Sequence, residues 1–123
     1  MAPRLREIFE GLTELMRVYG PSEVAVETSF HAMNAQSALK LGHARGAILL
    51  AASLLDVPVF EYTPTEVKKA TCGYGHADKG QIHDMVCTIL NIRRESLSSR
   101  DASDALAVGV CHASARRMRG ILA

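Results

Sequence analysis

Residues 23–46 read EVAVETSFHAMNAQSALKLGHARG, and this stretch decides the fold that we expect. Its first five residues predict a short strand that is buried along the run from Val24 to Val26 and ends on the carboxylate of Glu27. A long helix is predicted from Asn34 to Leu55. In α/β proteins, where strands and helices alternate, ligands gather at the carboxyl ends of strands. Glu27 is therefore the first candidate for a functional residue.

The segments on either side extend the same pattern. Upstream, apolar residues at the three-and-four spacing predict a helix over residues 4–19, which Gly20 and Pro21 end. Downstream, we predict a second strand over residues 58–62 and three helices, which begin at Thr63-Pro64-Thr65-Glu66, at Asp78 and at Asp101. The last of these is expected to run to about Arg117. This order predicts a single α/β domain over residues 1–123, with parallel strands.

Two features of this prediction are unusual. Two short strands make a poor sheet, because stable sheets have about four to six strands. Either a partner supplies strands or part of the domain is absent. Gly42 and Gly46 also share one face of the long helix. Glycine inside a helix costs up to about 1 kcal/mol relative to alanine, so we expect a neighbouring backbone to approach closely at these two positions.

The composition is that of an ordinary globular protein. Apolar residues make up 48% and charged residues 22%, and the net charge is +1. No apolar run is long enough to span a bilayer and no secretory signal opens the chain, so a cytoplasmic location is expected. The 3 cysteines form no CxxC pair and the 5 histidines lack zinc-ligand spacing. We therefore expect neither a disulfide framework nor a zinc site.

Three carboxylates are candidates for a metal site. Glu27 ends a buried strand, and Asp101 and Asp104 share one face at the start of a helix, where the helix dipole favours negative charge. Such oxygen donors are the ligands that Mg²⁺ and Mn²⁺ prefer, and two such ions can drive phosphodiester cleavage. The alternative is that the two aspartates simply cap their helix.

Four further residues could contact a nucleic acid. Phe30 lies in a polar loop, where an aromatic ring can stack on an unpaired base or fold back onto the core. Lys68, Lys79 and Arg45 could bind phosphates, although exposed basic residues on helices are often only solvated.

Four blocks of the chain, read in order, resemble one known family. Residues 26–46 closely resemble the central signature of the RuvC family. Residues 58–62, 67–68 and 73–79 look like its next segments, and residues 101–107, which read DASDALA, resemble its closing acidic motif. The match covers nearly the whole chain, and the shared order makes it specific.

The resemblance implies an RNase H-like fold and a homodimer that resolves four-way (Holliday) DNA junctions in recombination and repair. Cleavage would be two-metal-ion hydrolysis with Mg²⁺ or Mn²⁺, and Glu27, Asp101 and Asp104 would be the catalytic metal ligands. Phe30 would stack on a base near the opened centre of the junction, and Lys68 and Lys79 would lie on the DNA path. The RuvA–RuvB branch-migration complex is the further partner that the resemblance implies.

The start of the chain departs from the family pattern. Family members begin with three strands, and the first carries a catalytic aspartate in a segment like Gly-Ile-Asp-Pro-Gly. This chain opens with MAPRL, which resembles the start of the family's first helix. We therefore expect an N-terminally truncated domain that lacks the first three-strand meander: a fragment, the product of a late-assigned start codon or a degenerate relative.

Three hypotheses for the function follow. The leading one is an endonuclease whose first catalytic aspartate is missing from this chain. The alternative is a catalytically incomplete remnant that still binds junctions or dimerises. The third, an unrelated small α/β protein, requires all four motif matches to be coincidental.

Overall fold

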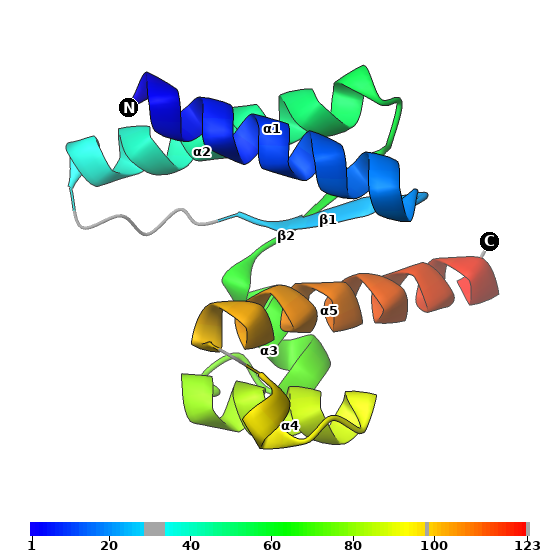
Figure 1. Cartoon of the computed structure of the whole chain (residues 1–123). Coiled ribbons are helices and arrows are strands. Elements are labelled where there is room, and N and C mark those ends of the chain that lie inside the picture. Colours follow the sequence, from blue (N-terminus) through cyan, green and yellow to red (C-terminus); the bar gives the residue numbers. More distant parts are fainter. Residues whose placement is uncertain (29–33, 98, 123) are drawn as a thin grey trace. The chain divides into compact units, whose positions relative to one another are not determined.

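The computed structural model describes residues 1–28, 34–97 and 99–122, except for the side chains of residues 121 and 122. These residues form two compact units, which we describe separately. The described part of the first unit consists of residues 1–24 and 34–60, and that of the second of residues 25–28, 61–97 and 99–122. Figure 1 shows the order of the helices and strands along the chain.

The first unit is built from two long helices that pack side by side (Figure 1). Helix α1 (Ala2–Tyr19) has Pro3 in its first turn and ends at Gly20, whose φ of 57° is the left-handed conformation typical of a helix end. Helix α2 (Ala35–Leu54) begins after Asn34, whose side chain accepts a hydrogen bond of 2.8 Å from the backbone N–H of Ser37. Both predicted helices are confirmed.

The core of this unit is thin. No residue of α1 is buried, and in α2 only Ala51 and Ala52 are buried. The apolar side chains whose spacing predicted α1 therefore remain at least partly exposed, and Leu15 is 52% exposed. The close approach predicted at Gly42 and Gly46 is wrong for the described residues, because a Cβ atom at either position would meet nothing within 4 Å. The buried contacts of α2 lie at its C-terminal end instead.

The two predicted strands form one two-stranded sheet, β1 (Val24–Glu27) with β2 (Val59–Tyr62). In the first unit, the N–H of Val24 donates to the carbonyl of Pro58 at 2.9 Å; in the second, the N–H of Thr28 donates to that of Tyr62 at 2.8 Å. Both pairs have the same offset along the chain, so the strands run parallel, as predicted.

The second unit contains the remaining helices: α3 (Pro64–Cys72), α4 (Lys79–Leu90), the short 3₁₀-helix η1 (Arg94–Ser96) and α5 (Arg100–Leu122). Helix α5 packs against both α3 and α4 (Figure 1). The predicted helix start at Thr63 is confirmed: Thr63 and Glu66 form a capping box there, and Asp78 and Gln81 form a second one at the start of α4. Helix α5 runs beyond the predicted end at Arg117, because Arg119 in its last turn suits the negative end of the helix dipole.

Buried residues of this unit converge from all three long helices, among them Val67 from α3, Val86 from α4 and Ala107 from α5. This small core fixes the end of β2 and the helices that carry the candidate site. No helix among the described residues is long and apolar enough to cross a membrane.

Candidate functional site

Glu27 is the last residue of β1 and belongs to the second unit. Partial burial of its carboxyl group has the largest influence on its pKa and raises it. Repulsion from the carboxylate of Asp104 raises the pKa further, whereas Lys68 and Lys79 lower it, and the net shift is upward. Glu27 is exposed as a residue, so water screens part of these effects.

The four charged groups reach this position from four elements of the same unit. Glu27 lies at the end of β1, Lys68 on α3, Lys79 at the first residue of α4, and Asp104 in the second turn of α5. The two capping boxes set where α3 and α4 begin, and therefore where the two lysines stand. The candidate site thus combines two carboxylates with two ammonium groups.

Asp101 lies in the first turn of α5 and is exposed. It is not among the groups that influence the pKa of Glu27. The described residues contain no group of three or more His, Cys, Asp or Glu side chains that could hold a metal ion. The structure therefore brings Glu27 and Asp104 together, and the predicted three-carboxylate metal site stays a prediction.

The capping alternative for Asp101 can be compared with the hydrogen bonds at the start of α5. There the side chain of Ser99 accepts a hydrogen bond of 3.2 Å from the N–H of Ala102, which is the usual capping contact. The hydroxyl of the buried Ser103 donates back to the carbonyl of Arg100 at 2.9 Å. A serine thus caps this helix, and the acidic residue in its first turn adds favourable charge.

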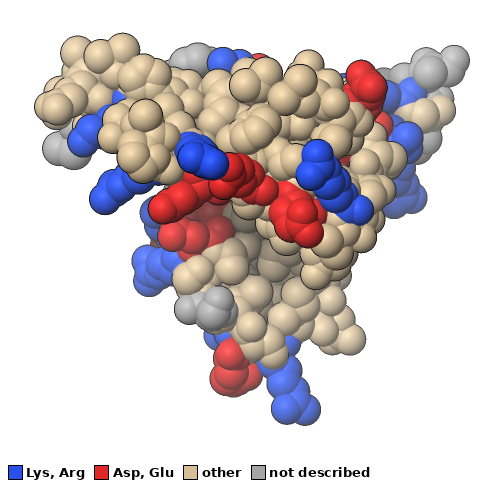
Figure 2. Space-filling model, turned by 45° about the horizontal axis from the view of Figure 1, so that its top comes forward, with Lys and Arg blue, Asp and Glu red and all other residues tan. Residues whose placement is uncertain are grey.

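The other predicted contact residues lie elsewhere. Phe30 lies outside the described residues. Arg45 is an exposed residue of α2 in the first unit. The molecular face shown in Figure 2 carries both acidic and basic side chains rather than a surface of one sign. The predicted roles of Phe30 and Arg45 in DNA binding remain predictions.

One group of contacting residues around Tyr62 was not predicted from the sequence. The hydroxyl of Tyr62, at the end of β2, lies 2.5 Å from Nδ1 of His112 and accepts a hydrogen bond of 3.2 Å from Arg119. Both partners are on α5, 50 and 57 positions away in the chain. No local sequence pattern predicts a contact between residues so far apart in the chain. The only signal was that Tyr62 ends a strand, as Glu27 does.

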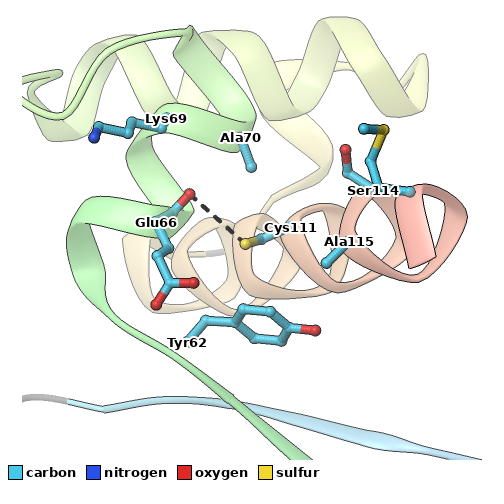
Figure 3. A pocket seen from close by; sticks show the side chains of 8 residues that line it. Tyr62, Glu66, Lys69, Ala70, Cys111, Ser114 and Ala115 are labelled. Atoms are coloured by element: carbon cyan, nitrogen blue, oxygen red, sulfur yellow. Dashed lines mark hydrogen bonds between the residues drawn. The ribbon is translucent and has the colours of Figure 1, made fainter. Parts of the chain in front are cut away.

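A shallow pocket of about 290 Å³ lies beside Tyr62 (Figure 3). Its lining includes Glu66 and Lys69 from α3, and Cys111 and Met118 from α5. The thiol of Cys111 lies 3.7 Å from the backbone carbonyl of Glu66. Burial and, after it, the Glu66 carboxylate raise the pKa of this thiol, which keeps it protonated and unreactive.

Known proteins match this chain over nearly its whole length. The family model described as "Crossover junction endodeoxyribonuclease RuvC" matches residues 1–112. Among curated proteins, RuvC of Geobacter metallireducens is 53% identical over 121 residues, which is 98% of this chain and 73% of the relative. RuvC of Geobacter sulfurreducens is 50% identical with the same coverage of both chains.

Solved structures give the same result. A Thermus thermophilus RuvC bound to a Holliday junction substrate superposes with a TM-score of 0.88 at 38% identity, over 94% of this chain and 70% of that one. A second structure of Thermus thermophilus RuvC gives a TM-score of 0.85 at 38% identity, over 94% and 69%. The sequence resemblance and the RNase H-like fold that it implied are confirmed. This chain belongs to the RuvC family of crossover junction endodeoxyribonucleases.

Proposed function

We propose that this chain acts in the resolution of four-way DNA junctions, as part of a RuvC-type endonuclease that hydrolyses phosphodiester bonds. The observation that carries the proposal is the charge grouping at Glu27, where Asp104, Lys68 and Lys79 all act on one carboxyl group. A site that cuts a DNA strand needs carboxylates for metal ions and cations for the phosphates beside them. The second unit provides both kinds of group in one place.

The carboxylates fit a divalent metal ion in donor type and in charge. Glu27 and Asp104 lie close enough for mutual repulsion, which a cation between them would relieve. We assign Mg²⁺ to this position, with Mn²⁺ as a substitute, and Asp101 as the predicted third ligand. When bound, the ion would supply an activated water and charge neutralisation at the scissile phosphate.

The remaining residues hold the DNA in this proposal. Lys68 and Lys79 bind the phosphates that flank the cut, because their ammonium groups already lie within electrostatic range of Glu27. Phe30 stacks on an unpaired base at the centre of the junction. Arg45 adds a phosphate contact from α2.

We further propose that the protein works as a homodimer in the cytoplasm, with the RuvA–RuvB complex as its partner. Two opposed strands of a junction are cut, and a two-fold symmetric dimer presents two identical sites for them. Apolar side chains that remain exposed on α1 and α2, such as Leu15 and Leu54, favour association.

A second candidate function is junction binding without cleavage. It is favoured by the absence, among residues 1–28, 34–97 and 99–122, of a group of three side chains that could hold a metal ion. In that case Glu27 and Asp104 would still lie at the junction surface, but the chain would only bind.

Junction binding tests what both candidates share. A synthetic four-way junction and a linear duplex of equal length are titrated with the protein in EDTA and in Mg²⁺. We expect the protein to bind the junction more tightly than the duplex under both conditions. We also expect Mg²⁺ to increase its affinity for the junction further, and Glu27→Gln to abolish this increase. The variant Glu14→Gln, on the exposed surface of α1, is the control for loss of a negative charge. Equal affinity for both DNAs contradicts the proposal.

A further inference from the structure

Tyr62 makes backbone contacts with the residue that follows Glu27. Its carbonyl accepts hydrogen bonds from the N–H of Thr28 at 2.8 Å and from the Thr28 hydroxyl at 3.3 Å. Both residues are buried, at 6% and 7% exposure, so water does not compete for these bonds. The end of β1, and with it the backbone of Glu27, is therefore fixed to Tyr62.

The hydroxyl of Tyr62 makes contacts with the helix that carries Asp104. A guanidinium group can only donate hydrogen bonds, so Arg119 donates to the hydroxyl oxygen at 3.2 Å. The same hydroxyl also shares a hydrogen bond with Nδ1 of His112, 2.5 Å away. The two rings also pack in a tilted arrangement, with their centroids 5.6 Å apart. Figure 3 shows the Tyr62 ring beside α5, close to Cys111.

We infer that Tyr62 is a positioning residue of the candidate site, which sets the placement of Glu27 relative to Asp104 through its carbonyl on one side and its hydroxyl on the other. All residues involved belong to the second unit. Neither contact touches the carboxylates themselves, so Tyr62 acts through the strand end and through α5. The inference rests on the proposed metal site at Glu27 and Asp104, because only there does this placement affect function.

The substitution Tyr62→Phe isolates the contribution of the hydroxyl, because it keeps the aromatic ring and the backbone carbonyl. Two variants change the same contact from the other side. His112→Leu removes the ring nitrogen that bonds to the Tyr62 hydroxyl, whereas His112→Asn retains a polar group near the position of Nδ1. The control is Tyr74→Phe, which removes the hydroxyl of a tyrosine that is 45% exposed in the same unit. Circular dichroism establishes that each variant is folded.

The first measurement needs neither metal nor DNA. The substitution Asp104→Asn is made in each background, and the change in the carboxyl ¹³C resonance of Glu27 is recorded at fixed pH. We expect this change to shrink by roughly twofold or more in Tyr62→Phe and in His112→Leu, because the repulsion between Glu27 and Asp104 weakens when their separation is no longer held short. The control Tyr74→Phe keeps the full change, and His112→Asn retains most of it. If Tyr62→Phe does not fold, His112→Leu gives the same information.

The second measurement is Mn²⁺ affinity, followed by electron paramagnetic resonance of the free ion. We expect Tyr62→Phe to bind Mn²⁺ roughly tenfold more weakly, as is usual when a group that orients metal ligands is lost. Junction affinity in EDTA stays unchanged, which separates a positioning effect from general loss of structure.

The two measurements test different claims, so each can contradict its own claim without the other. The proposed metal site is wrong if the unmodified protein does not bind Mn²⁺, or if Glu27→Gln leaves its Mn²⁺ binding unchanged. The resonance comparison still decides the role of Tyr62 in that case. If Asp104→Asn shifts the Glu27 resonance equally with and without the Tyr62 hydroxyl in folded protein, Tyr62 is only a packing residue and the inference is overturned.

Discussion

Glu27 is a carboxylate that the fold holds in a place unfavourable to its charge. Burial and, after it, repulsion from Asp104 raise its pKa. A group with a raised folded-state pKa contributes stability that is fully present below its unfolded pKa and is lost as the pH rises through the folded pKa. In the absence of metal, the charged form of Glu27 therefore destabilises the protein at neutral pH.

We expect Glu27→Gln to stabilise the metal-free protein at pH 7, by at most about 1 kcal/mol because water screens the exposed part of the group. The gain disappears below about pH 4, where Glu27 is protonated in both the folded and the unfolded state. Urea unfolding at the two pH values measures it, with Glu14→Gln as the control. A variant that is less stable than the unmodified protein at pH 7 contradicts this reading of the site.

Lys68 and Lys79 act on the same carboxyl group in the opposite direction. We expect Lys68→Gln to raise the pKa of Glu27 further, because a favourable positive neighbour is lost. In the proposed complex it also removes one phosphate contact, which lowers the salt dependence of junction binding by about one unit of slope. Lys69→Gln, one position along α3 and absent from the groups that act on Glu27, is the matched control for the pKa, which carboxyl NMR titration measures. Equal pKa changes in the two variants would contradict the assignment of Lys68 to the site.

In the loop from α3 to α4, Gly75 lies close to side chains of α3. A Cβ atom there would lie 3.0 Å from Cγ2 of Thr65 and 3.6 Å from Cε of Lys69. We expect Gly75→Ala to destabilise the protein by about 1 kcal/mol, the usual effect of mild overpacking. Thr65→Ser removes Cγ2, so the double variant regains most of the loss. Thermal unfolding of the two single variants and the double variant measures this coupling.

Gly42 in α2 is the matched contrast, because a Cβ atom there meets nothing within 4 Å. Gly42→Ala is expected to stabilise the helix by up to about 1 kcal/mol, since the alanine has the higher helix propensity. If Gly42→Ala destabilises the protein instead, or if Thr65→Ser leaves the effect of Gly75→Ala unchanged, the local packing described for these positions is wrong.

The elements also show which parts of the structure could be predicted from sequence. Helix starts were predictable, because Thr63 and Glu66 are three positions apart and satisfy the backbone locally. The burial of α1 was not, because its apolar spacing defines a face but not how completely that face is covered. The contact of Tyr62 with His112 joins residues 50 positions apart, and only the tertiary fold decides it. The grouping of Glu27 with Asp104 was predicted because a family resemblance stood in for that tertiary information.

For the whole molecule, the number of metal ligands decides whether the chain can cleave DNA by two-metal-ion hydrolysis. Two-metal-ion hydrolysis needs ligands that hold ions on both sides of the scissile phosphate. The described residues place Glu27 near Asp104 but contain no group of three side chains that could hold a metal ion. The chain spans about 73% of the length of the Geobacter metallireducens relative, so that protein has residues beyond the match that can be joined to this chain.

We therefore expect that the 123-residue chain binds junctions in Mg²⁺ without cutting them, and that a chimera extended by the unmatched part of that relative cuts them. In the chimera, Glu27→Gln abolishes cleavage and preserves binding in EDTA, because it removes a metal-binding charge and little volume. Denaturing gels of a synthetic junction, labelled on each strand in turn, measure the position and symmetry of the nicks, and Glu14→Gln serves as the charge control. Symmetric nicks made by the 123-residue chain itself would mean that Glu27, Asp104 and the residues around them suffice for catalysis. A chimera that binds junctions but does not cut them would favour the junction-binding function over the nuclease.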